Sequence, residues 1–377
     1  MPAGGNKPYQ RSSNRSHVLD ALRRNPGASR RDLASMLGLD RSTITLITAE
    51  LLERGLLDET GTAGGSTRRG RPTVGLRIRN ERLRVLGIEL HAGGYRAVVR
   101  DNAGTIHARL EGRHALRGVG KAELTALLAD ICRSAGSENP IIGVGCAIPG
   151  SVDSTTPTVL YSRELEIRNV NLPRRIQVDD TLQIPVVFDN DARCGAWGEL
   201  HYRNTETASL IFVTAQKQGA HFGVGMGIVS DGSVISGAHH TSGEFYSPDW
   251  QGDERSQFSC QHSDLVRVGS DRAITRTVFA EIVRGLVPSA SVIDPDAIVF
   301  GGFLREHYAQ LLEVAREIPA AASVKRLFVP GSLESDEVTA GASGMFHEHL
   351  FDVPGFTTED SARSIGWDAI TRILGAA

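Results

Sequence analysis

Residues 29–55 read SRRDLASMLGLDRSTITLITAELLERG, and this stretch has the spacing of two short helices joined by a glycine turn. Ser29 and Asp32 form an acidic variant of a capping box at the start of the first helix, and Gly38 ends that helix. Asp40 can cap the second helix. The apolar residues at helical spacing are Leu33, Met36 and Leu37 in the first helix and Ile44, Ile47, Leu51 and Leu52 in the second. Two such helices around a tight turn indicate a helix-turn-helix.

The flanking segments extend this unit to a winged helix-turn-helix. Upstream, SNRSHVLDALRRNPG (residues 13–27) has an apolar stripe at helical spacing and ends on an Asn-Pro-Gly stop. Downstream, LLDETGTAGGSTRRGRPTVGLRIR (residues 56–79) has apolar residues at both ends of a Gly-rich loop, which is typical of a two-stranded wing. Residues 1–11 have few apolar groups, and we expect a disordered tail there. The DNA-binding domain is therefore placed at residues 12–80.

The second helix of the pair would enter the DNA major groove by its N-terminal end. Its candidate contacts are Arg41, Ser42, Thr43, Thr45 and Thr48, and Arg30 and Arg31 begin the preceding helix. The wing tip contains Arg68, Arg69, Gly70 and Arg71, followed by a proline. An arginine framed by glycine and proline can lie in a narrow, A·T-rich minor groove. Two alternatives stay open: plain solvent exposure of each Ser and Thr, and a flexible basic loop that contacts only phosphates.

Charge is unevenly distributed along the chain. The formal net charge is -3, yet residues 1–80 contain 14 Lys and Arg against 7 Asp and Glu, while the remainder contains 27 against 37. A basic head on an acidic body is expected when only the head binds nucleic acid, although a solvated basic face would give the same balance. No apolar run reaches the roughly 18 residues that a membrane span requires. We expect a cytoplasmic protein with no membrane partner, whose four widely spaced cysteines are reduced thiols.

Residues 81–377 have the pattern of a two-lobed α/β fold of the actin-like (ribonuclease H-like) type. Three short strands, VLGIEL, YRAVVRD and IHARLEG, precede a helix near residues 121–134 and a strand IIGVGCAI. This order is the opening of an actin-like ATPase lobe, and SLIFVTA, GVGMGIVSDG and DAIVFGG repeat the theme. We place the first lobe at about 81–190 and the second at about 191–360. The helix after Ser361 is expected to cross back onto the first lobe.

The succession of SRRDLASMLGLDRSTIT, LLERGLLDE and GRP, followed by the actin-like strands, resembles the repressor branch of the ROK family (repressors, open reading frames and sugar kinases). The resemblance covers the chain from about Asn14 onward. It implies a winged helix-turn-helix in front of a sugar-kinase-like domain. Leu46 departs from the pattern, because such repressors often carry a polar or basic recognition residue there. No operator sequence is therefore carried over.

Two phosphate-binding loops of the family's sugar kinases are altered. In the kinases the turn between the first two strands reads DxGGT, and its backbone N–H groups approach the ATP phosphates. Here the turn spans Glu89–Tyr95, with a tyrosine in place of the threonine, and the bulky Gln216–Phe222 segment occupies the approach to the second loop. The sequence therefore predicts a domain that is not an enzyme and holds no cofactor.

The positions that bind the sugar in the family's kinases match this sequence more closely than the phosphate-binding loops do. Asn190 and Asp191 match the family's Asn-Asp pair, which bonds sugar hydroxyls and supplies the kinase general base, and Glu244 matches the glutamate of the family's ExGH motif. A helix cap is the alternative role for Asp191. A zinc site could in principle draw on His239, His240, Cys260 and His262. We expect no metal, because the family's cysteine cluster is missing.

These patterns predict a DNA-binding transcriptional regulator, and a repressor in particular. It would bind a double-stranded DNA operator as a homo-oligomer, expected to be a dimer, and sense a sugar or sugar derivative through Asn190, Asp191 and Glu244. One alternative is a ligand-independent architectural DNA-binding protein, favoured if the Gln216–Phe222 segment closes the cleft. The other is an active sugar kinase with an attached DNA-binding head.

Overall fold

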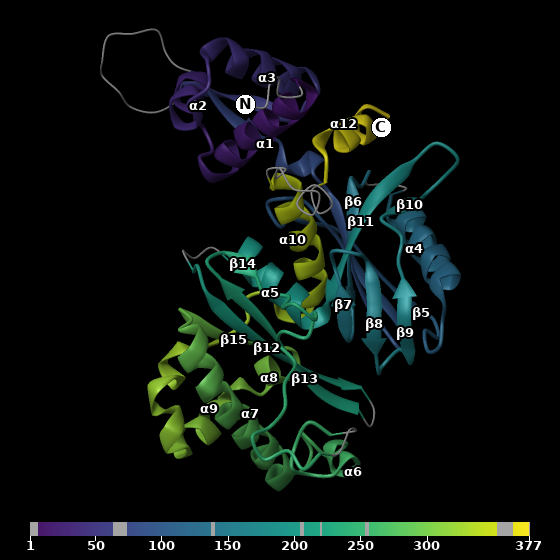
Figure 1. Cartoon of the computed structure of the whole chain (residues 1–377), viewed down its shortest axis with the longest axis vertical. Coiled ribbons are helices and arrows are strands. Elements are labelled where there is room, and N and C mark those ends of the chain that lie inside the picture. The colour runs from purple at the N-terminus through teal and green to yellow at the C-terminus, as the bar shows by residue number, and fades with distance from the viewer. Residues whose placement is uncertain are drawn as a thin grey trace, which may run out of the picture.

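The computed structural model describes residues 7–62, 74–136, 140–203, 207–218, 221–252, 256–352 and 365–376. A helical head lies at one end of the molecule, above two α/β lobes, and the C-terminal helix lies between the head and the first lobe (Figure 1). Among the residues described, no helix combines the length and the apolar character that a membrane span needs.

The head is a three-helix unit with a two-stranded wing. Its elements are α1 (Lys7–Arg24), α2 (Arg30–Leu37), α3 (Arg41–Glu53), β1 (Leu57–Thr62) and β2 (Val74–Ile78). The capping box between Ser29 and Asp32 forms in both directions, and Gly38 adopts a left-handed φ of 62° at the end of α2. Asp40 stands at the N-cap of α3 but makes no side-chain capping hydrogen bond. The predicted helix-turn-helix is thus present.

The first helix begins earlier than expected. The predicted tail over residues 1–11 is wrong for residues 7–11, which form the first turns of α1, and residues 1–6 lie outside the described part of the chain. Arg11 donates a 2.8 Å hydrogen bond to Glu50 of α3, and Arg15 lies 3.4 Å from the same carboxylate. This anchoring to another helix could not be read from local composition.

The first lobe contains a six-stranded mixed sheet in the order β10-β11-β6-β3-β4-β5. Its strands, with the covering helix, are β3 (Val85–His91), β4 (Gly94–Arg100), β5 (Ile106–Arg113), α4 (Lys121–Gly136), β6 (Gly143–Ile148), β10 (Arg175–Gln177) and β11 (Gln183–Asn190). A small separate sheet joins β7 (Ser151–Asp153), β8 (Thr158–Ser162) and β9 (Ile167–Asn171). The parallel register of β3, β6 and β11 brings their C-terminal ends to one edge, which is where ligands bind in sheets of this kind.

The second lobe has a five-stranded sheet in the order β14-β13-β12-β15-β16. Its strands are β12 (Leu210–Gln218), β13 (His221–Ser230), β14 (Ser233–Val234), β15 (Ala297–Gly301) and β16 (Phe328–Pro330). Its helices are α6 (His262–Leu265), α7 (Arg272–Ile293), α8 (Gly302–Glu306) and α9 (Tyr308–Glu317). The β12–β13 hairpin projects below α5 (Asp191–Tyr202) and α10 (Glu337–Phe351), the two helices that lie between the lobes (Figure 1).

The chain returns to the first lobe at α10 (Glu337–Phe351), earlier than the assignment of residues up to 360 to the second lobe implied. A Cβ atom on Gly87 would lie 1.9 Å from the Thr339 carbonyl oxygen, and one on Gly145 would lie 1.7 Å from that of Ala342. These two strand glycines let α10 pack directly on β3 and β6. Its other side packs on α5 (Asp191–Tyr202), so the two helices form the connection between the lobes.

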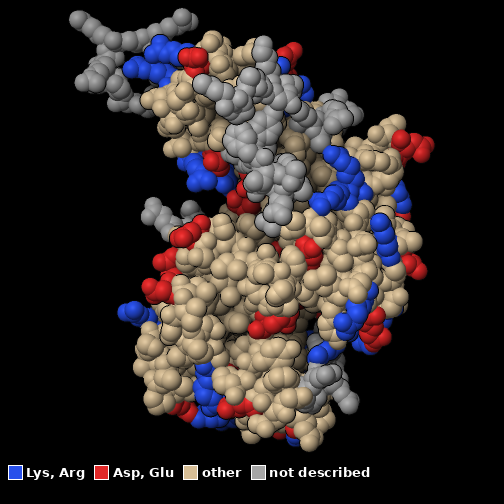
Figure 2. All heavy atoms as spheres, in the orientation of Figure 1, with Lys and Arg blue, Asp and Glu red and all other residues tan. Residues whose placement is uncertain are grey.

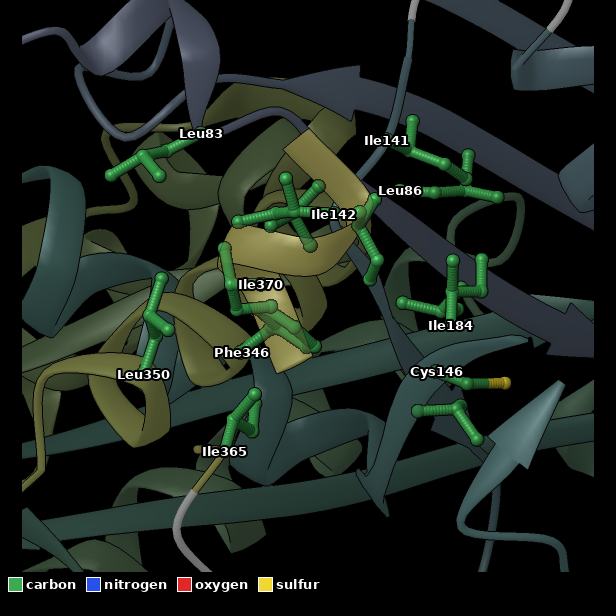
Figure 3. Close-up of a cluster of buried hydrophobic side chains, with 14 of the residues drawn as sticks. Leu83, Leu86, Ile141, Ile142, Cys146, Ile184, Phe346, Leu350, Ile365 and Ile370 are labelled. Carbon is green, nitrogen blue, oxygen red and sulfur yellow. The ribbon is translucent and has the colours of Figure 1, made fainter. Parts of the chain in front are cut away.

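The last helix, α12 (Trp367–Ala376), closes the first-lobe core as expected. Ile365 and Ile370 point into the cluster that contains Ile142, Phe346 and Leu350 (Figure 3). Trp367 is fully enclosed in the same core, which continues without a break into the apolar centre of the head. A continuous apolar core between head and body favours one arrangement of the two.

Candidate functional site

The candidate DNA surface lies on α2 and α3. Arg31, Arg41, Ser42 and Thr45 are exposed there, and Thr43 is half-buried. Figure 2 shows Lys and Arg side chains on the outer part of the head. The predicted wing contacts Arg68, Arg69, Gly70 and Arg71 lie outside the described residues.

Two residues of the predicted DNA set have structural roles instead. Thr48 is fully buried and its hydroxyl donates to the Ile44 carbonyl at 2.8 Å, so its assignment as a DNA contact was wrong. The same hydroxyl accepts from Arg30 Nε at 3.1 Å, and Arg30 Nη2 bonds Glu59 of β1 at 3.0 Å. Arg30 therefore ties α2 to α3 and to the wing.

Leu46 lies on the exposed face of α3, next to Ser42 and Thr45, and is 63% exposed. Sequence reasoning treated it only as a departure from a family pattern. An exposed aliphatic side chain on a recognition helix can contact a thymine methyl group in the major groove.

The second candidate site is a pocket of about 570 Å³ between the lobes. Asn190, Asp191 and Glu244 all line it, as do Glu164 of the first lobe and Gln216 of the second. Glu244 reaches the pocket through an isolated bridge with Gly225 of β13. Gln216–Gln218 pair with His221–Gly223 in the β12–β13 hairpin, and the Gln216 and Phe222 side chains line the pocket; residues 219–220 lie outside the described part of the chain.

Asn190 positions the pocket floor. Its Oδ1 accepts from the backbone N–H groups of Ala192 and Arg193 at 2.9 and 3.1 Å, and its Nδ2 donates to the Gly150 carbonyl at 2.8 Å. The helix cap considered for Asp191 is thus supplied by Asn190. This frees Asp191 to face the pocket at the first turn of α5.

Asp191 is electrostatically unusual. Its Oδ1 accepts from the Ala192 N–H and its Oδ2 from Gln216 Nε2, both at 2.9 Å. Burial raises the pKa of Asp191 to about 7, and the nearby carboxylates of Glu89, Glu164 and Glu244 add to the rise. A half-buried carboxyl group that exchanges its proton near neutrality can accept hydrogen bonds from sugar hydroxyls, or donate one.

Arg193, which sequence reasoning missed, braces the pocket from below. Its side chain is 2% exposed, and its Nε donates to Asp189 of β11 at 2.5 Å. It also donates to the carbonyls of Val152 at 2.8 Å and His240 at 3.2 Å, so it joins the small sheet to the second lobe. No helical spacing rule could have found this pair, because Asp189 lies on β11 and Arg193 on α5.

The turn that matches the family's first phosphate-binding loop makes hydrogen bonds to the protein's own side chains. The Ala92 N–H donates to Glu164 Oε1 at 2.8 Å, and the Gly93 N–H donates to His91 Nδ1 at 3.2 Å. The adjoining cleft of about 740 Å³ is lined by Glu89 and Glu337, among other residues. Burial raises the pKa of Glu337 to about 8. Backbone donors that would face a phosphate are directed at side chains, and carboxyl groups stand nearby.

The four residues considered for zinc do not form a site. His239 lines the interlobe pocket, and His240 lies 3.5 Å from Asp153. Across the described residues, no group of three or more His, Cys, Asp or Glu side chains is arranged to hold a metal ion.

A third cluster joins head and body. Glu348 of α10 accepts from Arg23 Nη1 of α1 and from His201 Nδ1 of α5, each at 2.6 Å. Burial alone would raise the pKa of Glu348, but the His201 hydrogen bond and the Arg23 charge lower it to about 2. Helix α5 therefore runs from Asp191 in the pocket to His201 at the head. Arg23 and Glu348 are 325 positions apart, so the sequence held no signal for this contact.

These features define a protein with a winged DNA-binding head on a two-lobed kinase-like body. Residues 85–246 match the ROK family, and residues 11–58 match the winged helix-turn-helix DNA-binding family. The chain carries a ROK family domain behind an N-terminal winged helix-turn-helix, as the sequence predicted.

Several known proteins are similar to this chain. A xylose repressor of Caldicellulosiruptor bescii is 27% identical over 246 residues, covering 64% of this chain and 59% of the relative. The chain thus matches less than two thirds of that protein's length. A xylose repressor of Bacillus spizizenii is 22% identical over 385 residues, covering 92% of this chain and 97% of the relative.

Solved structures show the same fold. A ROK family transcriptional regulator, described as a homolog of the E. coli MLC protein, superposes with a TM-score of 0.65 at 18% identity, covering 97% of this chain and all of that one. A ROK family glucokinase from Streptomyces griseus, in complex with glucose and AMPPNP, gives a TM-score of 0.54 at 20% identity, covering 69% of this chain and 98% of that one. The predicted actin-like fold class is thereby confirmed.

Proposed function

We propose that this protein is a transcriptional repressor that binds a double-stranded DNA operator as a homo-oligomer, expected to be a dimer, and responds to a carbohydrate. One observation carries the proposal: the same chain combines a head whose α3 has an exposed polar N-terminal face with a body whose interlobe pocket is lined by Asp191 and Glu244. The xylose repressors among its relatives support this combination of DNA binding and sugar response.

The head would read DNA mainly through α3 and the wing. Arg41, Ser42 and Thr45 stand at the end of α3 that enters the major groove, and Arg31 is placed for a phosphate contact. Arg71 of the wing would lie in an A·T-rich minor groove. Because one head offers few base contacts, two heads related by two-fold symmetry would bind an imperfect palindrome.

The body would bind a ligand without phosphorylating it. Phosphoryl transfer needs positioned phosphates, and the turn that would cradle them donates to Glu164 and His91 instead. Asp191 can still accept a proton from a hydroxyl group. Without an aligned γ-phosphate this leads to binding rather than reaction, so we propose that the protein is not a kinase.

Helix α5 offers a route from the pocket to the head. Its N-terminal end holds Asn190 and Asp191, and its C-terminal end holds His201, which shares Glu348 with Arg23 of α1. A ligand that closes the lobes would shift α5 and change the placement of the head. Such coupling requires that the ligand bind one arrangement more tightly than the other.

The first test is to map the DNA sites bound by the full chain and to titrate them by fluorescence anisotropy with and without sugars. Arg71→Ala should weaken binding chiefly at A·T-containing positions, whereas Arg316→Ala on exposed α9 is the control. Specific palindromic sites and a sugar-dependent loss of affinity are expected.

Each contrary outcome points to one alternative. Sequence-independent binding that no sugar changes would favour an architectural DNA-binding protein. Sugar-dependent ATP turnover that Asp191→Asn abolishes would favour an active kinase.

A further inference from the structure

The pocket continues beyond the residues that match the family's sugar positions. Its outer wall comes from the β8–β9 hairpin, where Tyr161 and Arg168 are cross-strand partners and Arg163 follows β8. The Arg168 guanidinium lies over the Tyr161 ring, 4.5 Å from its centroid. Tyr246 lines the opposite, second-lobe side. These four residues are called the outer rim below.

The pocket is larger than one sugar ring. A pyranose occupies roughly 180 Å³, about six times the ~30 Å³ that one water takes up in the liquid. The pocket measures about 570 Å³. After one ring has bound at Asp191 and Glu244, room remains for at least a second unit against the rim.

The rim exposes aromatic rings, although the Arg168 guanidinium covers one face of Tyr161. Tyr161 is 39% exposed and Tyr246 is 52% exposed, and the Tyr246 ring packs against Trp250 with centroids 4.7 Å apart. Exposed aromatic rings whose polar tips remain in water are suited to stacking on the apolar face of a sugar ring.

Charge separates the floor of the pocket from its rim. The floor carries the carboxyl groups of Glu164, Asp191 and Glu244, which suit hydroxyl donors. The rim carries Arg163 and Arg168, which are both exposed. The Arg163 side chain makes no hydrogen bond or ion pair with the residues that the structure describes, so its planar donor fork is available for a carboxylate or a phosphate. Burial raises the pKa of the Glu244 carboxyl group, and the positive charges of Arg193 and Arg163 oppose that rise.

We propose that the outer rim is a second subsite, and that the ligand is a saccharide of two or more units whose outer unit carries an anionic group. The proposal rests on the carbohydrate response proposed above. A ligand of this length contacts the β8–β9 hairpin of the first lobe and Tyr246 of the second. It therefore favours lobe closure more strongly than a single sugar ring, which stays on the floor.

The test compares ligands that differ only in length or charge. Calorimetry on the full chain would use xylose, xylobiose and glucuronosyl-xylose, together with glucose, cellobiose and cellobiose 6′-phosphate. The two charged disaccharides separate a carboxylate source from a phosphate source of the anion. We expect at least one charged disaccharide to bind about tenfold more tightly than its neutral counterpart, with each monosaccharide weaker still.

The double variant Arg163→Gln/Arg168→Gln should remove this charge preference and leave neutral disaccharides within about twofold of their original affinity, because it retains the tyrosines and the floor. Arg316→Gln on α9 is the matched control, since it removes an exposed arginine away from the pocket.

The outcomes separate this proposal from the function itself. Equal affinity for neutral and charged disaccharides, monosaccharides that bind as tightly as disaccharides, or a preference that survives in the double variant would each overturn the subsite while leaving a sugar-responsive repressor intact. If no sugar of the series binds and Asp191→Ala changes nothing, the carbohydrate response and the subsite both fail.

Discussion

The carboxyl groups at the two ends of α5 differ in whether they have a positively charged or hydrogen-bonding partner that stabilises the ionised form. At the pocket end, Asp191 has a pKa raised to about 7 by burial and neighbouring carboxylates. At the head end, Glu348 has a pKa lowered to about 2 by His201 and Arg23. One carboxyl group lacks a positive partner and the other has two donors from different parts of the molecule. A single rigid helix thus links an end that a ligand can stabilise to an end that already fixes the head.

The largest effect is expected at the head end. Glu348→Gln removes a partly buried ion pair and should lower the free energy of unfolding by about 3 kcal/mol at neutral pH. Because the folded-state pKa of Glu348 is lowered, its contribution is present above the ordinary carboxyl pKa and is lost as the pH falls toward 2. Urea denaturation at pH 7 and pH 3 should show a difference that shrinks in acid. Glu313→Gln on exposed α9 is the control, and an unchanged difference at pH 3 would contradict the assignment.

The pocket end is tested by removing its acceptor. Asp191→Ala should weaken carbohydrate binding by about 100-fold or more, since two hydrogen bonds to a charged group are together worth about 3–6 kcal/mol. DNA affinity without ligand should stay within about twofold, because the head surface is unchanged. Calorimetry and operator titration on the same preparation measure both, and full retention of ligand affinity would show that Asp191 is not part of the floor.

A pH series sharpens the contrast between the two carboxyl groups. The folded-state pKa of Asp191 is raised, so its contribution to stability is complete below its ordinary pKa and is lost as the pH rises through about 7. Asp191→Asn should therefore make the ligand-free protein more stable at pH 8.5, by about 2 kcal/mol after solvent screening, and should have a clearly smaller effect at pH 5. Thermal unfolding across this range is the measurement. A variant less stable than the parent at pH 8.5 would contradict the raised pKa.

The smallest effect concerns communication between the ends. Arg23→Met keeps an unbranched side chain but removes the guanidinium group, which lies over the Phe351 ring and donates to Glu348. Ligand binding and DNA binding should each persist, while the ligand-induced change in DNA affinity falls by about tenfold, within the usual range of coupling energies. Arg24→Met is the control, because Arg24 is an exposed neighbour whose side chain pairs with Asp20 of the same helix. Unaltered coupling would mean that the signal bypasses this contact.

Local patterns located most of the elements and part of the site. The capping box at Ser29, the alternation in the strands and the Asn190-Asp191 pair each act over a few residues, so their consequences could be read along the chain. Thr48 shows where this reading fails. Its position on the helix suggested exposure, but packing against α2 buried it beneath Arg30.

The sequence by itself determined the winged head, the two-lobed body and the acceptor residues of the pocket, because helix caps, hydrophobic periods and strand-end polar residues depend on near neighbours. Only the tertiary structure decided that Glu164 accepts from the Ala92 N–H, that Arg193 donates to both lobes and that Glu348 joins Arg23 to His201. The physical reason is that these contacts join segments brought together by packing, and a burial-induced pKa shift exists only after such packing has removed water from the group.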